Sequence, residues 1–531
     1  MRRRPFLIAA ALVLTWAAVP ILAQSSPSAA TSDAQQPVQS PAASASAQGP
    51  DQQPPDSTPA AQTPDQTPPT DPAAAKPPDK NRPAPQSPGV RTGGVEVTDT
   101  VTVGGYGSVR YEANTLDKPK PSGFDFRRFV LTTDATPNDR LQAYAEIEFE
   151  RLAEIEVERA VDRSRDGVSF AEELEGGNGG EISMEQMWGQ FKFGDPFSVR
   201  LGQILVPLGR FNINHDDDKW DIPRRSLVDR NVPVLPVRAA WTELGVGATG
   251  SVPVGKSGQL TYQGYVINGA ILDFTIEKEV ETEDGQSILK LASETGVTRG
   301  PVNGEDGVRA GTWRIAYSPT LTTDIGFSGY IGRYTPDFLN VNERITSLGI
   351  DGLWKRGSFA LEGEYIHTGF GDTDRVMDAF IDTVTGSTGI APLAGAQGTE
   401  TEFAITDLTP SRQGFWLEGR YRFWSERWKD SVLGKGFDDP TLVGVVRYER
   451  VRLHNAIQEA TIENGEIERG DAETLRQERT TFALAYRPLQ TVVFSVATEF
   501  NRRLEGPVLV FPRGFPERRY ASILAGLAFG F

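Results

Sequence analysis

Segments in which apolar and polar residues alternate run from residue 99 to the C-terminus, and they constrain the fold more than any other feature. In LQAYAEIEFE, residues 141–150, the odd positions hold Leu, Ala, Ile and Phe, while the even positions hold Gln, Tyr and Glu. GFWLEGRYRFW, residues 414–424, repeats the pattern. Successive side chains of a strand point to opposite faces, so each segment is predicted to form a β-strand with one apolar and one polar face.

About sixteen such segments follow one another, an even number, as is typical of single-chain bacterial outer-membrane barrels. The predicted fold class is therefore all-β, a transmembrane antiparallel β-barrel of about sixteen strands, with a disordered Pro-rich N-terminal segment. The strands are expected near Asp99–Ala113, Gly123–Ala135, Arg140–Arg151, Ile182–Gly194, Phe197–Val206, Ala239–Val252, Gly258–Gly269, Val308–Ser318, Leu321–Arg333, Glu343–Lys355, Ser358–Gly369, Gln413–Ser425, Thr441–Leu453, Thr474–Arg487, Gln490–Arg503 and Glu517–Phe531.

The connections between these segments alternate between tight and long. Tight links are residues 136–139, 195–196, 253–257, 319–320, 356–357 and 488–489, and the link that contains residues 430–439 interrupts this regularity. Long links follow Arg151, Val206, Ala270, Phe370, Leu453 and Leu504. A soluble sandwich or propeller has no reason to confine its long loops to every second connection, so the alternation favours a barrel with short periplasmic turns and long extracellular loops.

The first residues have the pattern of a signal peptide. Three arginines at positions 2–4 precede an apolar run that ends near Ala23, so residues 1–23 are predicted to be removed on export. An uncleaved anchor helix is the alternative. Residues 24–95 are rich in Pro, Ala and Gln and are predicted to be a disordered linker, either a periplasmic tether or a spacer without a fixed partner. Residues 96–531 form the predicted barrel domain.

The composition excludes several kinds of protein. The chain has no cysteine, which rules out disulfides, thiolate metal sites and a lipidated N-terminal cysteine. Its formal charge of −17 makes nucleic-acid binding unfavourable. No segment after Leu22 is long and apolar enough to cross a bilayer as a helix, so any insertion has to use a closed barrel.

The last segment, ERRYASILAGLAFGF, alternates in polarity and ends on Phe531. An amphipathic strand with a terminal Phe resembles the signal that the barrel-assembly machinery reads, so this machinery is a predicted partner. Tyr421, Trp424, Trp428, Tyr486 and Tyr520 lie near predicted strand ends and are expected in the aromatic girdles at the membrane interfaces.

Several fragments resemble the phosphate-selective porin O and P family. They are GQILVPLG at 202–209 after the strand FSVRLGQ, FDFRRFVL at 124–131 and GFSGYIGRY at 326–334. The resemblance covers roughly residues 97–531. It implies an outer-membrane porin of a Gram-negative bacterium, commonly a homotrimer, whose water-filled channel passes small hydrophilic solutes or ions by passive diffusion, including anions such as phosphate. It also implies that the third extracellular loop folds inward and narrows the pore.

The third long connection, residues 207–238, is the corresponding loop here, and it carries charges of both signs. If its arginines crowd the constriction, oxyanions gain charge-assisted contacts. Alternatively, Arg224, Arg225 and Arg230 pair with the adjacent aspartates and only brace the loop. The predicted constriction residues are Arg210, Asp216, Asp217, Asp218, Lys219, Arg224, Arg225, Arg230 and Arg238.

The polar faces of the strands predict a lumen wall of mixed sign, without the continuous basic ladder known from phosphate-specific members of the family. The predicted wall residues are Arg110, Glu146, Glu148, Arg314, Glu362, Glu364, Glu418, Arg420, Arg422, Arg447 and Glu499.

Nothing in the sequence indicates catalysis or a cofactor. The run His215–Asp218 lacks the spaced ligands and central glycine of a calcium loop, and the three histidines show no ligand spacing, so no metal site is predicted. His367 precedes Thr368, but neighbours on a strand point to opposite faces, so they do not form a nucleophile–base pair. An exported β-rich surface-binding or adhesion protein is the alternative to a porin.

Overall fold

The computed structural model describes residues 94–116, 123–151, 155–164, 167–176, 181–231, 234–283, 286–301, 309–388, 396–405, 409–463, 466–469, 472–506 and 517–531. The predicted signal peptide, and the predicted linker up to residue 93, lie outside these residues. Within them, no helix has the length and apolar character needed to cross a bilayer.

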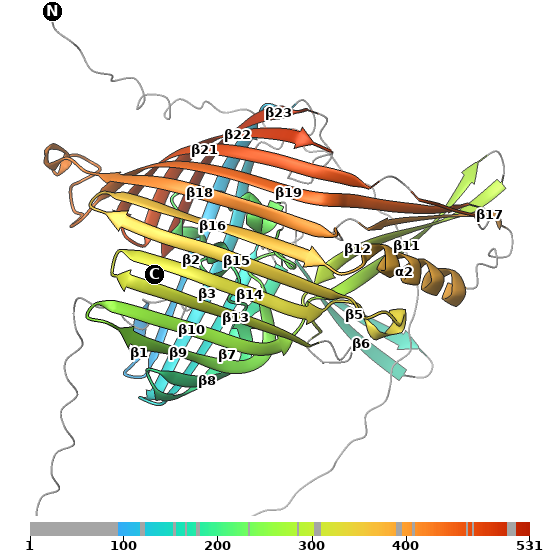
Figure 1. The fold of residues 1–531 in the computed structure, drawn as a ribbon, viewed down its shortest axis with the longest axis horizontal. Helices are drawn as coiled ribbons and strands as arrows, with labels where there is room; N and C mark the ends of the chain where they lie inside the picture. The colour runs from blue at the N-terminus through green and yellow to red at the C-terminus, as the bar shows by residue number, and fades with distance from the viewer. Residues whose placement is uncertain are drawn as a thin grey trace, which may run out of the picture. The chain divides into compact units, whose positions relative to one another are not determined.

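Sixteen antiparallel strands form a closed barrel, because β2 pairs with β3 on one side and with β23 on the other (Figure 1). The barrel strands are β2 (Val101–Asn114), β3 (Gly123–Asn138), β4 (Leu141–Glu150), β7 (Glu181–Gly194), β8 (Phe197–Leu205), β9 (Thr242–Val254), β10 (Gly258–Asn268), β13 (Arg309–Thr320), β14 (Thr323–Arg333), β15 (Arg344–Arg356), β16 (Phe359–Phe370), β18 (Ser411–Phe423), β19 (Thr441–Glu463), β21 (Glu473–Leu489), β22 (Val492–Glu505) and β23 (Arg519–Gly530). Each of the sixteen expected strands is confirmed, with ends that differ by a few residues except on β19, which was expected to end at Leu453 and continues to Glu463.

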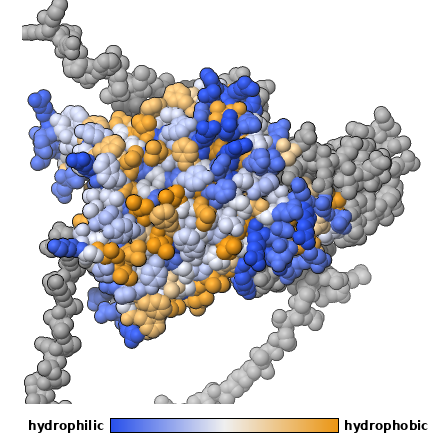
Figure 2. Space-filling model, in the orientation of Figure 1, coloured by the Kyte–Doolittle hydropathy of each residue, from blue (hydrophilic) through white to orange (hydrophobic). Residues whose placement is uncertain are grey.

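The barrel has an apolar outer face and a polar inner face. On β15, Leu348 and Ile350 are exposed, whereas Gly349 between them and Ser347 and Asp351 on either side are buried. The outward apolar side chains of neighbouring strands lie side by side, as Ile350 does with Phe327 on β14 and Tyr365 on β16. Figure 2 shows hydrophobic residues over the middle of the barrel face in view and strongly hydrophilic ones toward its ends. Such a surface matches the hydrocarbon layer of a bilayer.

At one end of the barrel, short turns connect neighbouring strands, as expected. They lie at residues 139–140, 195–196, 255–257, 321–322, 357–358 and 490–491. The connection from β18 to β19 is longer and contains η5 (Glu426–Trp428). Tyr421, Trp424, Trp428 and Tyr486 lie near this end, and the rings of Trp424 and Tyr486 stack 6.3 Å apart. Tyr520, expected in an outer girdle, is instead buried on the inner face of β23, because it alternates with the exposed Arg519.

The opposite end carries additional structure that the sequence patterns did not predict. β5 (Ile155–Ser164) and β6 (Gly167–Gly176) form a hairpin. β11 (Ile271–Glu283), β12 (Gln286–Thr298), β17 (Ala396–Ile405) and β20 (Glu466–Arg469) join the outer part of β19 in a second sheet, seen at the right of Figure 1 beside α2 (Thr373–Thr388). The remaining short elements are β1 (Val95–Thr98), α1 (Arg210–Ile213), η2 (Asp217–Lys219), η3 (Leu227–Asn231) and η4 (Asp337–Leu339).

Candidate functional site

The connection between β8 and β9, residues 206–241, lies inside the barrel and contacts its inner wall. It turns inward at Gly209, whose φ of +74° is a conformation that favours glycine. A Cβ at this position would lie 2.7 Å from Ile366 Cδ1 and 3.0 Å from Glu364 Oε2, both on β16. A glycine is therefore required here for two reasons, the backbone angle and the close approach to the wall.

Arg210 anchors the beginning of this inner loop to three neighbouring strands. Its Nη1 lies 2.9 Å from Asp324 Oδ1 on β14 and 3.5 Å from Asp351 Oδ1 on β15, and its Nε donates to Glu362 on β16. The Glu364 carboxylate accepts the backbone N–H of Phe211 at 3.0 Å. Charge-assisted bonds of this kind are the strong ones, so the loop is fixed where it leaves the wall.

Aromatic packing fixes the middle of the inner loop. The rings of Phe211 and Trp220 stack with centroids 4.4 Å apart, and Trp416 of β18 meets both edge-on. The Arg447 guanidinium lies 5.2 Å from the Trp220 ring, within cation–π range. Ile222 packs in a small apolar patch of the wall that includes Val443. The loop and the wall on this side therefore share a continuous core.

Arg224 anchors the far side of the inner loop to two strands near the barrel seam. Its Nε lies 3.0 Å from Glu499 Oε2 on β22, and its Nη2 pairs with Glu112 on β2. The backbone carbonyls of Arg224 and Arg225 accept bonds from Arg447 and Arg479 of the wall. Burial acts to lower the pKa of Arg224, but the carboxylates of Glu499 and Glu112 outweigh it and hold that pKa above its ordinary value.

Arg225 pairs within the loop itself. Its Nη1 lies 3.4 Å from Asp229 Oδ2 and its Nε lies 3.8 Å from Asp217 Oδ1. Asp217 also accepts a bond from Ser108 at 2.7 Å and lies 3.5 Å from Arg128 Nε. Burial acts to raise the pKa of the Asp217 carboxyl, but Arg128 and Arg225 outweigh it and hold that pKa well below its usual range.

Of the two alternatives for the arginines, pairing with adjacent aspartates thus describes Arg225, while Arg224 pairs with the wall. Arg238 is exposed, and the Arg230 side chain lies outside the described part of the structure. Asp218 is buried and its backbone carbonyl accepts a bond from Arg487, which also pairs with Asp221 at 2.7 Å.

Most of the expected wall residues are buried on the inner face and form ion pairs there. Arg420 pairs with Glu362 and Glu418, and Arg447 holds the same Glu418 at 2.7 Å. Further pairs on the inner face include Arg128 with Glu148, Arg314 with Asp351, Arg479 with Glu449 and Arg110 with Asp125. Arg422 differs, because it is exposed near the turn end, where Lys355 of β15 is its charged neighbour.

Charges of both signs keep some access to solvent in this region. The side chains of Asp217 and Lys219 on the loop are 19% and 33% exposed, and those of Asp125 and Asp324 on the wall are 32% and 25% exposed. A water path along the loop would therefore meet paired acidic and basic groups rather than a ladder of one sign.

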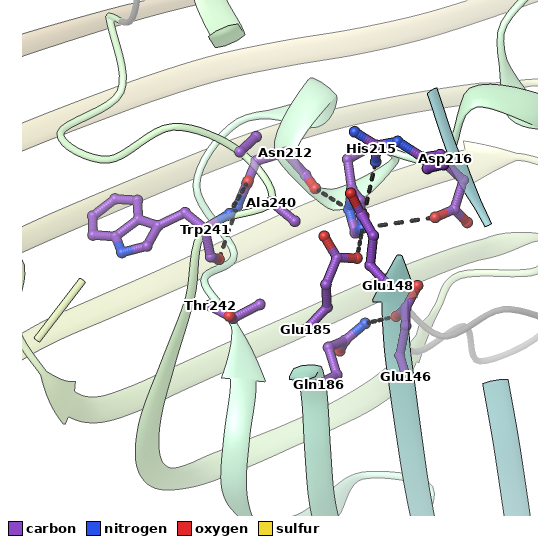
Figure 3. A network of polar contacts seen from close by, with 12 residues as sticks. Glu146, Glu148, Glu185, Gln186, Asn212, His215, Asp216, Ala240, Trp241 and Thr242 are labelled. Carbon is purple, nitrogen blue, oxygen red and sulfur yellow. Dashed lines mark hydrogen bonds and ion pairs between the residues drawn. The ribbon is translucent and has the colours of Figure 1, made fainter. Parts of the chain in front are cut away.

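A third contact region joins the inner loop to β4 and β7 (Figure 3). His215 Nε2 lies 3.1 Å from Glu185 Oε2 and 3.6 Å from Asp216 Oδ1. Glu146 lies beside them and accepts a bond from Gln186 at 2.7 Å. Burial acts to lower the pKa of His215, but the carboxylates of Glu185, Asp216 and Glu146 outweigh it and raise this pKa to about 9.

A β-bulge explains why alternation missed one of the inward residues, Glu185. β4 and β7 pair as Glu146 with Gln186 and then Ile147 with Met184, so Glu185 is an extra residue on its strand. Glu185 and Gln186 consequently both face inward and are both buried. Glu112, Asp324 and Asp351 were also missed, although strict alternation with their apolar neighbours identifies them.

Comparison with known proteins yields remote likenesses. No family model matches the chain. An uncharacterized protein of Aquifex aeolicus is 26% identical over 175 residues, a match that spans a third of either chain. Three similar solved structures, each 10% identical to this chain, are an anion-selective porin from Comamonas acidovorans, OmpF of Salmonella typhi in complex with daunomycin and the outer membrane channel DcaP of Acinetobacter baumannii. The matches cover 81%, 81% and 82% of this chain and 99%, 97% and 100% of the other chains, respectively. Their TM-scores are 0.43, 0.43 and 0.40.

The fold assignment rests on the strand pairing of this chain itself. The barrel closes through β2 and β23, exposes apolar side chains on its outside and encloses a charged wall with an inward loop. The chain is a closed β-barrel of sixteen antiparallel strands.

Proposed function

We propose that the protein is an outer-membrane channel through which small hydrophilic solutes diffuse passively. The observation that carries the proposal is the two-sidedness of the closed barrel, with exposed apolar side chains such as Ile350 outside and ion pairs such as Arg314–Asp351 inside. A water-soluble binding protein rarely exposes a contiguous apolar surface of this extent. Charged and hydroxyl groups inside a barrel replace the bilayer with a polar path for a solute.

The proposed selectivity is weak. Phosphate recognition requires guanidinium or ammonium groups that are available to an oxyanion. Arg224 and Arg225 are buried and donate to carboxylates and carbonyl oxygens of the protein, so an anion would have to displace these partners. Lys355 and Arg422 are exposed at the turn end and support a modest preference for anions. The homotrimer that the family resemblance implies stays a prediction.

Planar-bilayer recording of the refolded protein tests this function. We expect ohmic single-channel current steps in potassium chloride. In a salt gradient, the reversal potential should be small, with the sign that indicates a preference for anions, and phosphate should block the current little. If the protein gave no current steps although its heat-modifiable gel mobility showed a folded barrel, this result would contradict the proposed channel function. Strong phosphate block would instead contradict weak selectivity and favour an oxyanion pore.

A further inference from the structure

Glu146, Glu185 and His215 bring three metal-ligating side chains together at the junction of the inner loop with β4 and β7. One ligand atom from each lies within 4.8 Å of the other two, and all three residues are buried. The residues come from three separate segments, so the cluster exists only in the folded barrel. One imidazole nitrogen with carboxylate oxygens is a donor set that first-row divalent cations, Zn²⁺ in particular, accept.

The imidazole is oriented as a ligand would be. His215 Nδ1 lies 2.9 Å from the backbone carbonyl oxygen of Asn212, which can only accept, so Nδ1 carries the proton and Nε2 faces the carboxylates. Metal-binding histidines typically donate their second ring N–H in this way. Asn212 is itself held firmly, since its side chain bonds the Val206 carbonyl at 2.7 Å and the Trp241 N–H at 2.9 Å.

The carboxylates are oriented by neutral donors. Gln186 Nε2 and the Tyr144 hydroxyl both donate to Oε2 of Glu146, at 2.7 and 3.3 Å, and so fix the orientation of this carboxylate. Trp188 Nε1 bonds Gln186 Oε1 at 3.3 Å and so fixes the orientation of that amide. The bulge that turns Glu185 inward beside Gln186 is a feature found next to functional sites more often than elsewhere.

The local charge balance leaves room for a divalent cation. The two other nearby carboxylates have their own partners, Glu148 with Arg128 at 3.0 Å and Asp216 with Lys219 at 2.8 Å. Among the residues that the structure describes, neither Glu146 nor Glu185 has a lysine or arginine within ion-pair distance. Among the described residues, the imidazole is the positive group at ion-pair distance from these two carboxylates, whereas Arg128 and Lys219 act on Glu185 and Glu146 from farther away. Four carboxylates therefore surround three positive groups, and a divalent ion would offset this excess of negative charge.

We propose that Glu146, Glu185 and His215 bind a divalent transition-metal cation, with Zn²⁺ as the best-suited ion, and that this ion links the inner loop to the barrel wall. The site is distinct from the two arginine anchors, which hold the loop to β14–β16 and to β2 and β22. The ion would hold the third side of the loop, where the imidazole of His215 pairs with Glu185 of the wall.

Calorimetric titration of the tag-free, refolded full chain, first treated with EDTA, tests the proposal without reference to conduction. We expect saturable binding of one Zn²⁺ per chain and weaker binding of Ca²⁺. Glu146→Gln and Glu185→Gln, which keep size and shape, should each weaken Zn²⁺ binding at least about 100-fold, because loss of an outer-shell partner alone costs roughly 10-fold to 100-fold. His454→Ala, which changes an exposed histidine outside the cluster, is the matched control and should bind like the parent.

X-ray absorption of the zinc-loaded parent protein provides a second measurement in case a variant does not fold. The expected spectrum has nitrogen and oxygen neighbours only, including one imidazole. Three results would overturn the proposal: no saturable binding by the parent chain, equal affinity in the parent and both glutamine variants, or a spectrum without imidazole. The cluster would then hold a proton in place of a metal. A channel that conducts but binds no zinc would refute this site alone, and zinc binding by a chain that does not conduct would refute only the proposed function.

Discussion

The guanidinium of Arg224 on the inner loop lies 3.0 Å from the carboxylate of Glu499 on β22, and both side chains are almost completely buried. Together with Arg210, which pairs with β14, β15 and β16, this contact holds the inner loop at two separated places on the wall. A loop fixed at both places keeps one position inside the barrel, and that position depends on these two arginines.

Glu499→Gln is expected to destabilise the inner loop. Breaking one side of a buried ion pair typically costs about 3–5 kcal/mol, because the remaining charge is left without its partner. We expect a lower urea midpoint for unfolding from lipid vesicles and larger, noisier single-channel currents. The matched control is Glu478→Gln, which removes an exposed pair with Arg502 and should cost no more than about 1 kcal/mol. Equal midpoints for the two variants would show that the buried pair does not stabilise the loop.

Gly209→Ala should displace the start of the inner loop. With φ +74° and ψ +155°, Gly209 lies in a region that residues other than glycine rarely adopt, which costs an alanine about 1–3 kcal/mol, and the added Cβ would also approach Ile366 and Glu364 too closely. Gly255→Ala is the comparison, since Gly255 also has a positive φ, of +62°, but a Cβ added there would meet no atom within 4 Å. Unfolding midpoints should fall more for Gly209→Ala. If both fall equally, the contact with β16 is relieved by a small shift and only the backbone angle matters.

Ile350→Arg tests the membrane-facing surface. An arginine on the lipid side at mid-membrane costs about 2–4 kcal/mol, whereas one near the interface costs about 0–1 kcal/mol. Ile350 lies in the middle of β15, and Leu489, equally exposed, ends β21 beside a turn. Folding into vesicles should therefore suffer strongly for Ile350→Arg and little for Leu489→Arg. A reversed order would place the bilayer elsewhere on the barrel.

Lys355→Glu and Arg422→Glu are expected to shift the reversal potential in a potassium chloride gradient toward cation preference. Both residues are exposed on the inner face of the turn end, where a fixed charge acts on ions entering the channel. Lys256→Glu, in the exposed turn before β10, changes the same charge outside the barrel and should leave the reversal potential nearly unchanged. If all three variants behave alike, the charge acts through the net field of the molecule and not through the inner face.

The sequence predicts the barrel well because each strand carries its own evidence. Alternation identifies a strand and its inward face from local residues, as Glu146 and Glu148 on β4 illustrate, and tight turns set the strand order. The extra strands β11 and β12 were missed because their segment ILDFTIEKEVETE was attributed to a long polar loop.

The contacts of the candidate sites were less predictable. The sequence places Arg224 on the loop but cannot specify Glu499 as its partner, since the two residues meet only when β22 closes the barrel beside β23. Glu185 was missed for a different reason: a bulge adds one residue to its strand, and a pattern of period two cannot register such an insertion. His215 therefore appeared to be isolated.

The pairing of β2 with β23 has a consequence for biogenesis. Val109 near the beginning of the domain lies opposite Leu527 near its end, so the barrel cannot close until β23 pairs with β2. Until that moment, β2 presents an unpaired edge that is open to other chains. Contacts this distant in the chain also form slowly. An unfinished sheet therefore needs protection until β23 is in place, and a truncation of even this last strand would leave that edge permanently exposed.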